Sequence, residues 1–99
     1  MKIKLSNLRL DFQRHKNLIE ENVVEYQARF CNGESFPPVY VRFDGTDYFL
    51  QDGFHRVEAA CRQGLEEIDC EVEPGTIEEM EAEYRKMLEE LLKSLRIHQ

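Results

Sequence analysis

The chain has 99 residues, of which 41% are hydrophobic and 33% are charged, and its formal net charge is −7. This length suits one small domain and is too short for two domains with separate cores. The composition is typical of a folded protein and excludes both a disordered chain and a strongly basic nucleic-acid-binding protein.

The first predicted elements are a short strand and a helix. Residues 3–5 form a candidate edge strand. Asn22, followed three residues later by Glu25, is a plausible capping pair for a helix that ends at Gly33. Apolar residues recur along one broad side of this helix, which predicts that this side faces the core.

A β-hairpin is predicted next. Pro37 and Pro38 cannot continue a helix. Val39, Val41 and Phe43 then alternate with Tyr40 and Arg42, as in a half-buried strand. The dipeptide at residues 44–45 is Asp-Gly, which favours a turn, and residues 48–50 form the returning arm.

A helix and a third strand follow the hairpin. A second Asp-Gly dipeptide at residues 52–53 opens a helix that carries Val57, Ala60 and Cys61 and ends at Gly64. Residues 68–72 then alternate between apolar and acidic side chains, which predicts a strand with one polar face.

The last predicted element is an amphipathic helix. Thr76 and Glu79 form a capping box, and apolar residues repeat about every 3.5 residues from Ile77 onward. This helix either packs on its own domain or mediates self-association. The expected fold class is therefore α+β, with a small mixed sheet, packed helices and the C-terminal amphipathic helix. Residues 1–75 form the domain, and residues 76–99 form the helix.

Location and cysteine chemistry are constrained by two absences in the sequence. No apolar run is long enough to span a membrane, and residues 1–10 lack the apolar core of a signal peptide, so a cytoplasmic location is expected. Cys31, Cys61 and Cys70 have neither disulfide-framework nor zinc-site spacing and are predicted to be buried thiols.

The residues most suggestive of chemistry are Asp52, Gly53, His55 and Arg56, where a strand joins a helix. The first N–H groups of a helix bind anions, because they have no intrahelical partner and lie at the positive end of the helix dipole. Gly53 would let the backbone approach a phosphate, Arg56 adds a planar donor group, and His55 could donate a hydrogen bond or move a proton.

A purely structural interpretation of these residues remains open. Asp52 is itself a good N-cap, and its carboxylate would compete with a phosphate for the same donors. In that interpretation Phe54 lies in the core, and His55 and Arg56 are only solvated.

The segments 36–39, 44–45, 48–50 and 52–56, followed by Gly64 and residues 71–76, resemble the N-terminal domain of ParB-like proteins of the ParB/sulfiredoxin superfamily. The resemblance covers residues 12–76, about two thirds of the chain. In this superfamily the turn matching residues 53–56 holds nucleotide phosphates: CTP in chromosome-partition proteins, ATP in sulfiredoxin, and ADP in a free-serine kinase.

The resemblance therefore implies that Gly53, His55 and Arg56 contact phosphate. Gln13 and Arg14 resemble an upstream segment of the family, which implies that Arg14 adds a second guanidinium to the same site; otherwise Arg14 is an ordinary surface arginine.

The sequence departs from the family pattern at two places. Phe54 stands where sulfiredoxin has its catalytic cysteine, so sulfinic acid reduction is not expected. After Thr76 there is one amphipathic helix and neither the second nucleotide motif nor the helix-turn-helix of partition proteins. Related proteins are also labelled ParB-like nucleases, but the label identifies no hydrolytic centre in this chain.

No metal ion is assigned from the sequence, and Asp52 and His55 are weak candidates among four hard or borderline ligands that include Asp47 and Glu58. Mg²⁺ bound together with a nucleotide would turn the repulsion between Asp52 and phosphate into bridging. In that version His55 and Asp52 are the candidate catalytic residues of a nucleotide hydrolase or phosphotransferase.

Three functions are thus considered. The first is a ParB-like domain that binds a nucleotide or another phosphorylated small molecule at residues 53–56, with or without Mg²⁺-dependent phosphate chemistry. The second is a non-enzymatic interaction or regulatory module that binds a protein partner or a second copy through residues 77–97. The third is a ParB-like nuclease, which the acidic charge disfavours; duplex DNA is not expected as a ligand of this chain by itself.

Overall fold

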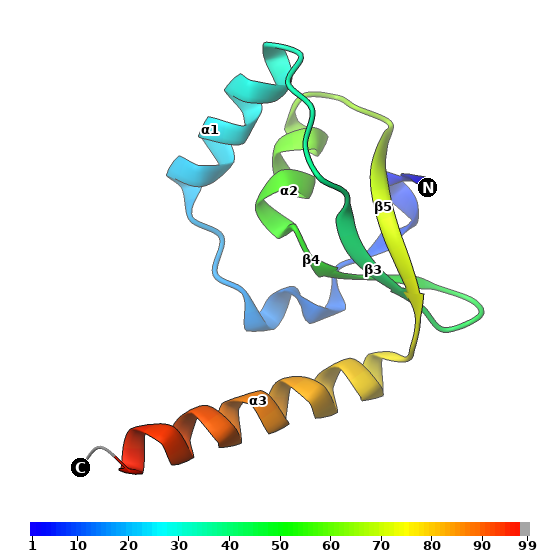
Figure 1. Cartoon of the computed structure of the whole chain (residues 1–99). Coiled ribbons are helices and arrows are strands. Elements are labelled where there is room, and N and C mark those ends of the chain that lie inside the picture. The colour runs from blue at the N-terminus through cyan, green and yellow to red at the C-terminus, as the bar shows by residue number, and fades with distance from the viewer. Residues whose placement is uncertain (98–99) are drawn as a thin grey trace.

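The computed structural model describes residues 1–97 (Figure 1). Three α-helices, five strands and two short 3-10 helices follow one another along this part of the chain. In order, they are β1 (Lys2–Lys4), η1 (Leu5–Asn7), β2 (Leu8–Arg9), η2 (Asp11–His15), α1 (Glu20–Cys31), β3 (Val39–Phe43), β4 (Tyr48–Asp52), α2 (Phe54–Arg62), β5 (Glu67–Pro74) and α3 (Ile77–Ile97).

The five strands form one mixed sheet in the order β1-β5-β3-β4-β2. Strands β3 and β4 are the predicted hairpin and pair antiparallel, with Val41 opposite Leu50. Strand β5 pairs parallel to β3 and antiparallel to β1, which lies at the sheet edge as predicted. The α+β class with a mixed sheet is therefore confirmed.

The hairpin turn is stabilised by the side chain of Asp44. Its Oδ1 accepts hydrogen bonds from the backbone N–H of Asp47 at 2.7 Å and of Thr46 at 2.9 Å. These bonds lower the pKa of the Asp44 carboxyl, because they stabilise its charged form. Gly45 has φ = 100°, which a residue with a side chain rarely adopts. The Asp-Gly dipeptide thus determines where the chain reverses.

Helix α2 covers the sheet, and α1 packs on α2 (Figure 1). Phe54 and Val57 of α2 join the buried strand residues Val39, Val41 and Leu50 in one core. Ala59 and Ala60 are fully buried, and their small side chains allow close approach of the neighbouring helix. The burial of these residues holds the start of α2 in a fixed position against the end of β4.

The predicted capping pair of the first helix is wrong. Helix α1 begins at Glu20, so Asn22 lies within its first turn, where its N–H donates to the Ile19 carbonyl at 3.0 Å. Ile19 is extended and its own N–H is bonded to a distant side chain, so a tertiary contact determines where the helix starts. The predicted end at Gly33 is confirmed: φ is 75° there, directly after the C-cap residue Asn32.

The prediction of three buried thiols is wrong for two of them. Cys70 on β5 is buried, and burial raises its pKa to about 11. Cys31 and Cys61 are exposed, because each lies in the last turn of its helix, where the buried face ends.

Helix α3 begins with the predicted capping box, in which the Glu79 N–H donates to Thr76 Oγ1 at 3.1 Å. Only its first part packs on the rest of the chain: Met80 is buried beside Phe12, and the Tyr84 ring lies edge-on to Phe12. The remainder extends away from the sheet (Figure 1). Within residues 1–97, none of the helices has the length and apolar character needed to cross a membrane.

Candidate functional site

The junction between β4 and α2 depends on Gly53. Its φ of 99° is left-handed, and a Cβ atom added there would lie 2.5 Å from Cγ1 of the buried residue Val39. Both the backbone conformation and the close approach of β3 therefore require glycine. This geometry lets the chain leave the strand and begin a helix within one residue.

The start of α2 is not capped by a side chain. Asp52 Oδ1 accepts a hydrogen bond from the Gly53 N–H at 2.9 Å, and the Gly53 carbonyl accepts from Val57 at 2.9 Å. Within the described residues, no hydrogen-bond acceptor is present for the N–H groups of residues 54–56. Asp52 therefore occupies the amide before the helix and leaves the first amides of the helix itself accessible.

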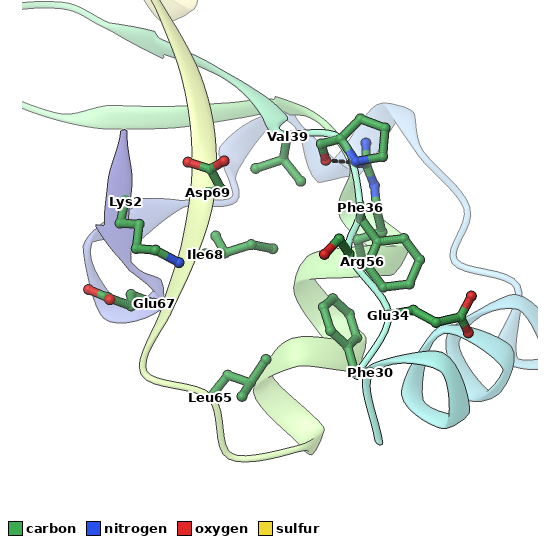
Figure 2. Close-up of a pocket in the computed structure, with 12 residues that line it drawn as sticks. Lys2, Phe30, Glu34, Phe36, Val39, Arg56, Leu65, Glu67, Ile68 and Asp69 are labelled. Carbon is green, nitrogen blue, oxygen red and sulfur yellow. Dashed lines mark hydrogen bonds between the residues drawn. The ribbon is translucent and has the colours of Figure 1, made fainter. Parts of the chain in front are cut away.

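The Arg56 side chain is hydrogen-bonded to the segment that precedes β3. One guanidinium nitrogen donates to the Pro37 carbonyl at 2.5 Å, as the dashed line in Figure 2 shows. Arg56 lines a cavity of about 300 Å³ whose apolar lining residues include Phe30, Phe36 and Ile68 (Figure 2). The same side chain also lines a second cavity, at the start of α2. Because a guanidinium has five N–H donors, the bond to Pro37 leaves others for a ligand.

His55 joins the starts of two helices. Its Nε2 accepts a hydrogen bond from the Ile19 N–H at 3.0 Å, and Ile19 is the residue that precedes α1. An Nε2 that accepts carries no proton, so the neutral ring has its proton on Nδ1. His55 can therefore donate a hydrogen bond from Nδ1 without losing its contact with α1.

These side chains line one cavity of about 410 Å³. Its walls come from the segment after η2, from α1 and from the start of α2. The lining residues are His15, Lys16, Asn17, Tyr26, Asp52, Gly53, Phe54, His55 and Arg56. The cavity thus combines cationic side chains and free backbone amides with one carboxylate, an arrangement suited to an anion.

Lys16 and Asn17 were not identified from the sequence. They follow η2 and lie almost forty positions before Arg56, yet they line the same cavity. The signal that could have found them is the basic run at residues 14–16, which lies in the only third of the chain with a net positive charge.

Arg14 does not line this cavity. One of its guanidinium nitrogens lies 2.8 Å from Glu81 Oε1 on α3, and 68% of its side chain is exposed. The neighbouring His15 contacts the other oxygen of Glu81 at 2.5 Å and stacks on Tyr84 with ring centroids 4.2 Å apart. The structure therefore brings Gly53, His55 and Arg56 together and directs Arg14 toward α3.

The Glu81 carboxylate connects α3 to η2. Desolvation alone would raise its pKa, but the hydrogen bond to His15 and the charge of Arg14 outweigh this effect and hold the pKa below its ordinary value. The charged form of Glu81 is therefore the form that the folded chain stabilises.

The candidate metal ligands are not gathered at one point. Asp47 pairs with Arg9 at 3.3 Å, and Glu58 pairs with Arg62 at 3.1 Å. Asp52 and His55 alone remain at the cavity, and residues 1–97 contain no group of three His, Cys, Asp or Glu side chains that could hold an ion. The side chains described here do not form a complete metal site by themselves.

Comparison with solved structures identifies the fold. Sulfiredoxin from Arabidopsis thaliana superposes with a TM-score of 0.73 over 83% of this chain and 92% of that chain, at 24% sequence identity. ParB from Caulobacter crescentus, in complex with CTP-γ-S, superposes with a TM-score of 0.67 over 81% of this chain, at 19% identity. The chain has the ParB/sulfiredoxin fold.

The similarity to ParB covers only part of that protein. This chain corresponds to 47% of the ParB chain in the CTP-γ-S complex, and to 42% of it in a complex with the centromeric parS site, where the TM-score is 0.62 and the identity 20%. No protein-family model and no curated protein sequence matches the chain. The comparisons therefore establish the fold and no activity.

Proposed function

We propose that this chain binds a nucleotide or another phosphorylated small molecule in the cavity at residues 53–56. The observation that carries the proposal is that the uncapped start of α2 opens into a cavity of about 410 Å³ beside the anchored guanidinium of Arg56. An anion there would meet several N–H donors together with the positive end of the helix dipole. The nucleotide-bound state of the ParB neighbour makes a nucleotide the first class of ligand to test.

In this proposal each residue has a separate part. Gly53 keeps the backbone clear of a side chain where phosphate approaches, Arg56 supplies N–H donors in a plane, and His55 donates from Nδ1. Lys16, which also lines the cavity, adds a positive charge. Arg14 pairs with Glu81 outside the cavity and makes no contact with the ligand in this proposal.

The charge of Asp52 makes phosphate binding depend on a cation that accompanies the phosphate. Its carboxylate lines the cavity and would repel a phosphate group. Mg²⁺ that arrives with a nucleotide would neutralise this repulsion, and Asp52 would then contact the ion. Bound Mg²⁺ would also supply charge stabilisation for phosphate chemistry, for which His55 and Asp52 remain the candidate catalytic residues.

Calorimetric titration with CTP, ATP, ADP and GTP, each with and without Mg²⁺, tests this function. Arg56→Ala is expected to weaken binding by roughly tenfold or more, because a charge-assisted hydrogen bond contributes about 1.5–3 kcal/mol. Arg14→Ala is the matched control: it removes the same charge outside the cavity, and we expect less than about a threefold change in the dissociation constant.

Thermal unfolding of both variants checks that the fold survives, since Arg56 also bonds to Pro37. Absence of binding at millimolar concentrations of every nucleotide, or equal loss in the two variants, would refute the proposal. Product analysis in the same samples determines whether bound nucleotide is hydrolysed or its phosphate transferred.

A specific observation also favours the second function, an interaction module. The part of α3 beyond Tyr84 leaves large apolar side chains exposed. This face is independent of the phosphate cavity and is treated next.

A further inference from the structure

The outer part of α3 has an apolar face with no partner in the described chain. Met87, Leu88, Leu91, Leu92 and Leu95 are between 37% and 57% exposed. A soluble monomer rarely exposes a contiguous group of large apolar side chains of this kind without a function for it. The 21-residue helix is about 32 Å long, so a second helix could lie along most of it.

The shape of the molecule shows how accessible this face is. The radius of gyration is 15.3 Å, against about 13 Å for a compact domain of 100 residues. The excess comes from α3, which projects beyond the sheet and the other helices (Figure 1). Another chain can therefore reach the apolar face without displacing any part of the domain.

One flank of the same helix has an alternating pattern of charge. Glu78, Arg85, Glu89 and Arg96 are separated by 7, 4 and 7 residues, which places them along one side of the helix. All four side chains are exposed, and none forms an ion pair within residues 1–97. The four charges on this flank therefore read negative, positive, negative, positive from one end of the helix and the opposite from the other end.

The complementarity appears when a second copy of α3 is placed antiparallel. With residue 87 at the centre of the pairing, Glu78 lies opposite Arg96 of the second copy, and Arg85 lies opposite Glu89 of the second copy, so all the facing charges on this flank are opposite. In a parallel two-fold pair, this flank of one helix lies on the opposite side of the pair from the same flank of the second copy, so these four residues would not face one another. Opposite charges on the flanks of paired helices select their orientation.

An antiparallel alignment shifted by one residue, with its centre between residues 87 and 88, matches the apolar residues. It places Tyr84 opposite Leu91 of the second copy, and Met87 opposite Leu88 of the second copy. Leu95 of the second copy then reaches the level of Met80, beside a cavity of about 260 Å³ between η2, the end of β4 and α3. Phe12, Met80, Tyr84 and Met87 form the apolar wall of this cavity, which a leucine side chain can cover.

We propose that two copies of this chain form a symmetric dimer in which their α3 helices pair antiparallel through this apolar face. Each copy buries the outer part of its own helix and covers the cavity at the base of the other. The arrangement is a closed two-fold contact, so it ends at two copies. The pairing of the helices does not require a ligand at residues 53–56, although Lys16 and Asp52 line both the covered cavity and the phosphate cavity.

Sedimentation equilibrium of the full chain over a range of concentrations tests the association. The expected limiting mass is twice 11.8 kDa. Leu91→Glu is expected to raise the dissociation constant more than about 100-fold, because it places a charge at the centre of the apolar contact. Leu91 is exposed in the single chain, so this variant should keep its fold, which circular dichroism checks.

A chain that is monomeric at about 1 mM would have a dissociation free energy below about 4 kcal/mol and would overturn the proposal. A dimer that persists in Leu91→Glu, or an assembly larger than two copies, would overturn it as well.

Charge exchange tests the orientation. Arg85→Glu is expected to weaken the dimer roughly tenfold, because symmetry creates two like-charge contacts with Glu89. Combining it with Glu89→Arg should restore the dissociation constant to within about threefold, since the facing charges are again opposite. Lys86→Glu changes the net charge equally but lies off this flank, so we expect less than about a threefold effect. A double variant that stays as weak as Arg85→Glu would exclude the antiparallel pairing.

Discussion

Gly53 determines where the candidate site lies, because it is the residue at which β4 ends and the helix amides begin. Its positive φ brings the chain sharply around, and the absence of a Cβ atom allows β3 to approach through Val39. The three residues that follow line the cavity, and their N–H groups have no hydrogen-bond acceptor within the described residues. A single backbone conformation thus links the core to the proposed phosphate contacts.

We expect Gly53→Ala to destabilise the chain more than Gly45→Ala. Both residues have φ near +100°, so each substitution incurs the left-handed backbone penalty of about 1–2 kcal/mol. Only at Gly53 would the new Cβ also clash with Val39; at Gly45 no atom lies within 4 Å. Urea unfolding of the two variants measures the difference, and equal midpoints would show that the contact with Val39 relaxes freely.

The part of the site that is contiguous in sequence could be predicted, and the part assembled from distant segments could not. Gly53, His55 and Arg56 follow one another at a strand-to-helix junction, so local rules identify them. Lys16 joins them only through the tertiary fold. Arg14 was expected beside Arg56, but Glu81 lies closer to it and attracts its guanidinium. No local pattern reveals that competition.

At the scale of elements, the attachment of α3 to η2 depends on a buried contact and a charged one. Met80 provides apolar burial against Phe12, while Glu81 receives both His15 and Arg14. Because the pKa of Glu81 is lowered in the folded chain, its ionised form contributes stability. That contribution is present above the unfolded pKa and is lost as the pH falls through the folded value.

Glu81→Gln is therefore expected to lower the melting temperature at neutral pH by an amount that shrinks under acid. The difference from the unmodified chain should be constant above about pH 5 and should disappear at lower pH, as the Glu81 carboxylate protonates. Glu90→Gln is the control, since Glu90 is exposed on the outer part of α3, lies off the charged flank and forms no ion pair within residues 1–97. A difference between Glu81→Gln and the unmodified chain that does not shrink as the pH falls would contradict this assignment.

The longer elements were predictable because their signals are local. Alternation of Val39, Val41 and Phe43, the two Asp-Gly turns and the capping box at Thr76 each act over a few residues. Strand β2 has two residues and η2 has five, too few for any periodicity to register. The parallel pairing of β5 with β3 joins residues about thirty positions apart, and no short-range pattern specifies it.

At the scale of the whole molecule, the chain has two parts that differ in whether their apolar side chains are buried. The sequence places the boundary between them at residue 75. The domain buries its apolar residues internally and also uses the first turns of α3, whereas the rest of α3 contributes nothing to that core. The folded domain therefore extends past Gly75 as far as Tyr84, although the sequence predicts a single helix over residues 76–99.

Two truncations test this division. A chain that ends at residue 75 should lose stability, because removal of a buried methionine side chain alone costs about 2–5 kcal/mol. A chain that ends at residue 86 retains Met80, Glu81 and Tyr84 and should melt near the full chain, when both are compared at a concentration where the full chain is monomeric. Equal melting temperatures for the two truncated chains would show that α3 is dispensable for the domain.

The bond between the Ile19 amide and the His55 ring makes that amide a built-in spectroscopic reporter. Ile19 lies outside the cavity lining, yet its proton is held by a ring that belongs to the lining. Any guest that shifts the imidazole, or any acid that protonates its Nε2, changes the magnetic environment and the solvent exchange of this one backbone proton. A single resonance in a nitrogen-15 spectrum can thus follow events at the start of α2 without a label attached to the site.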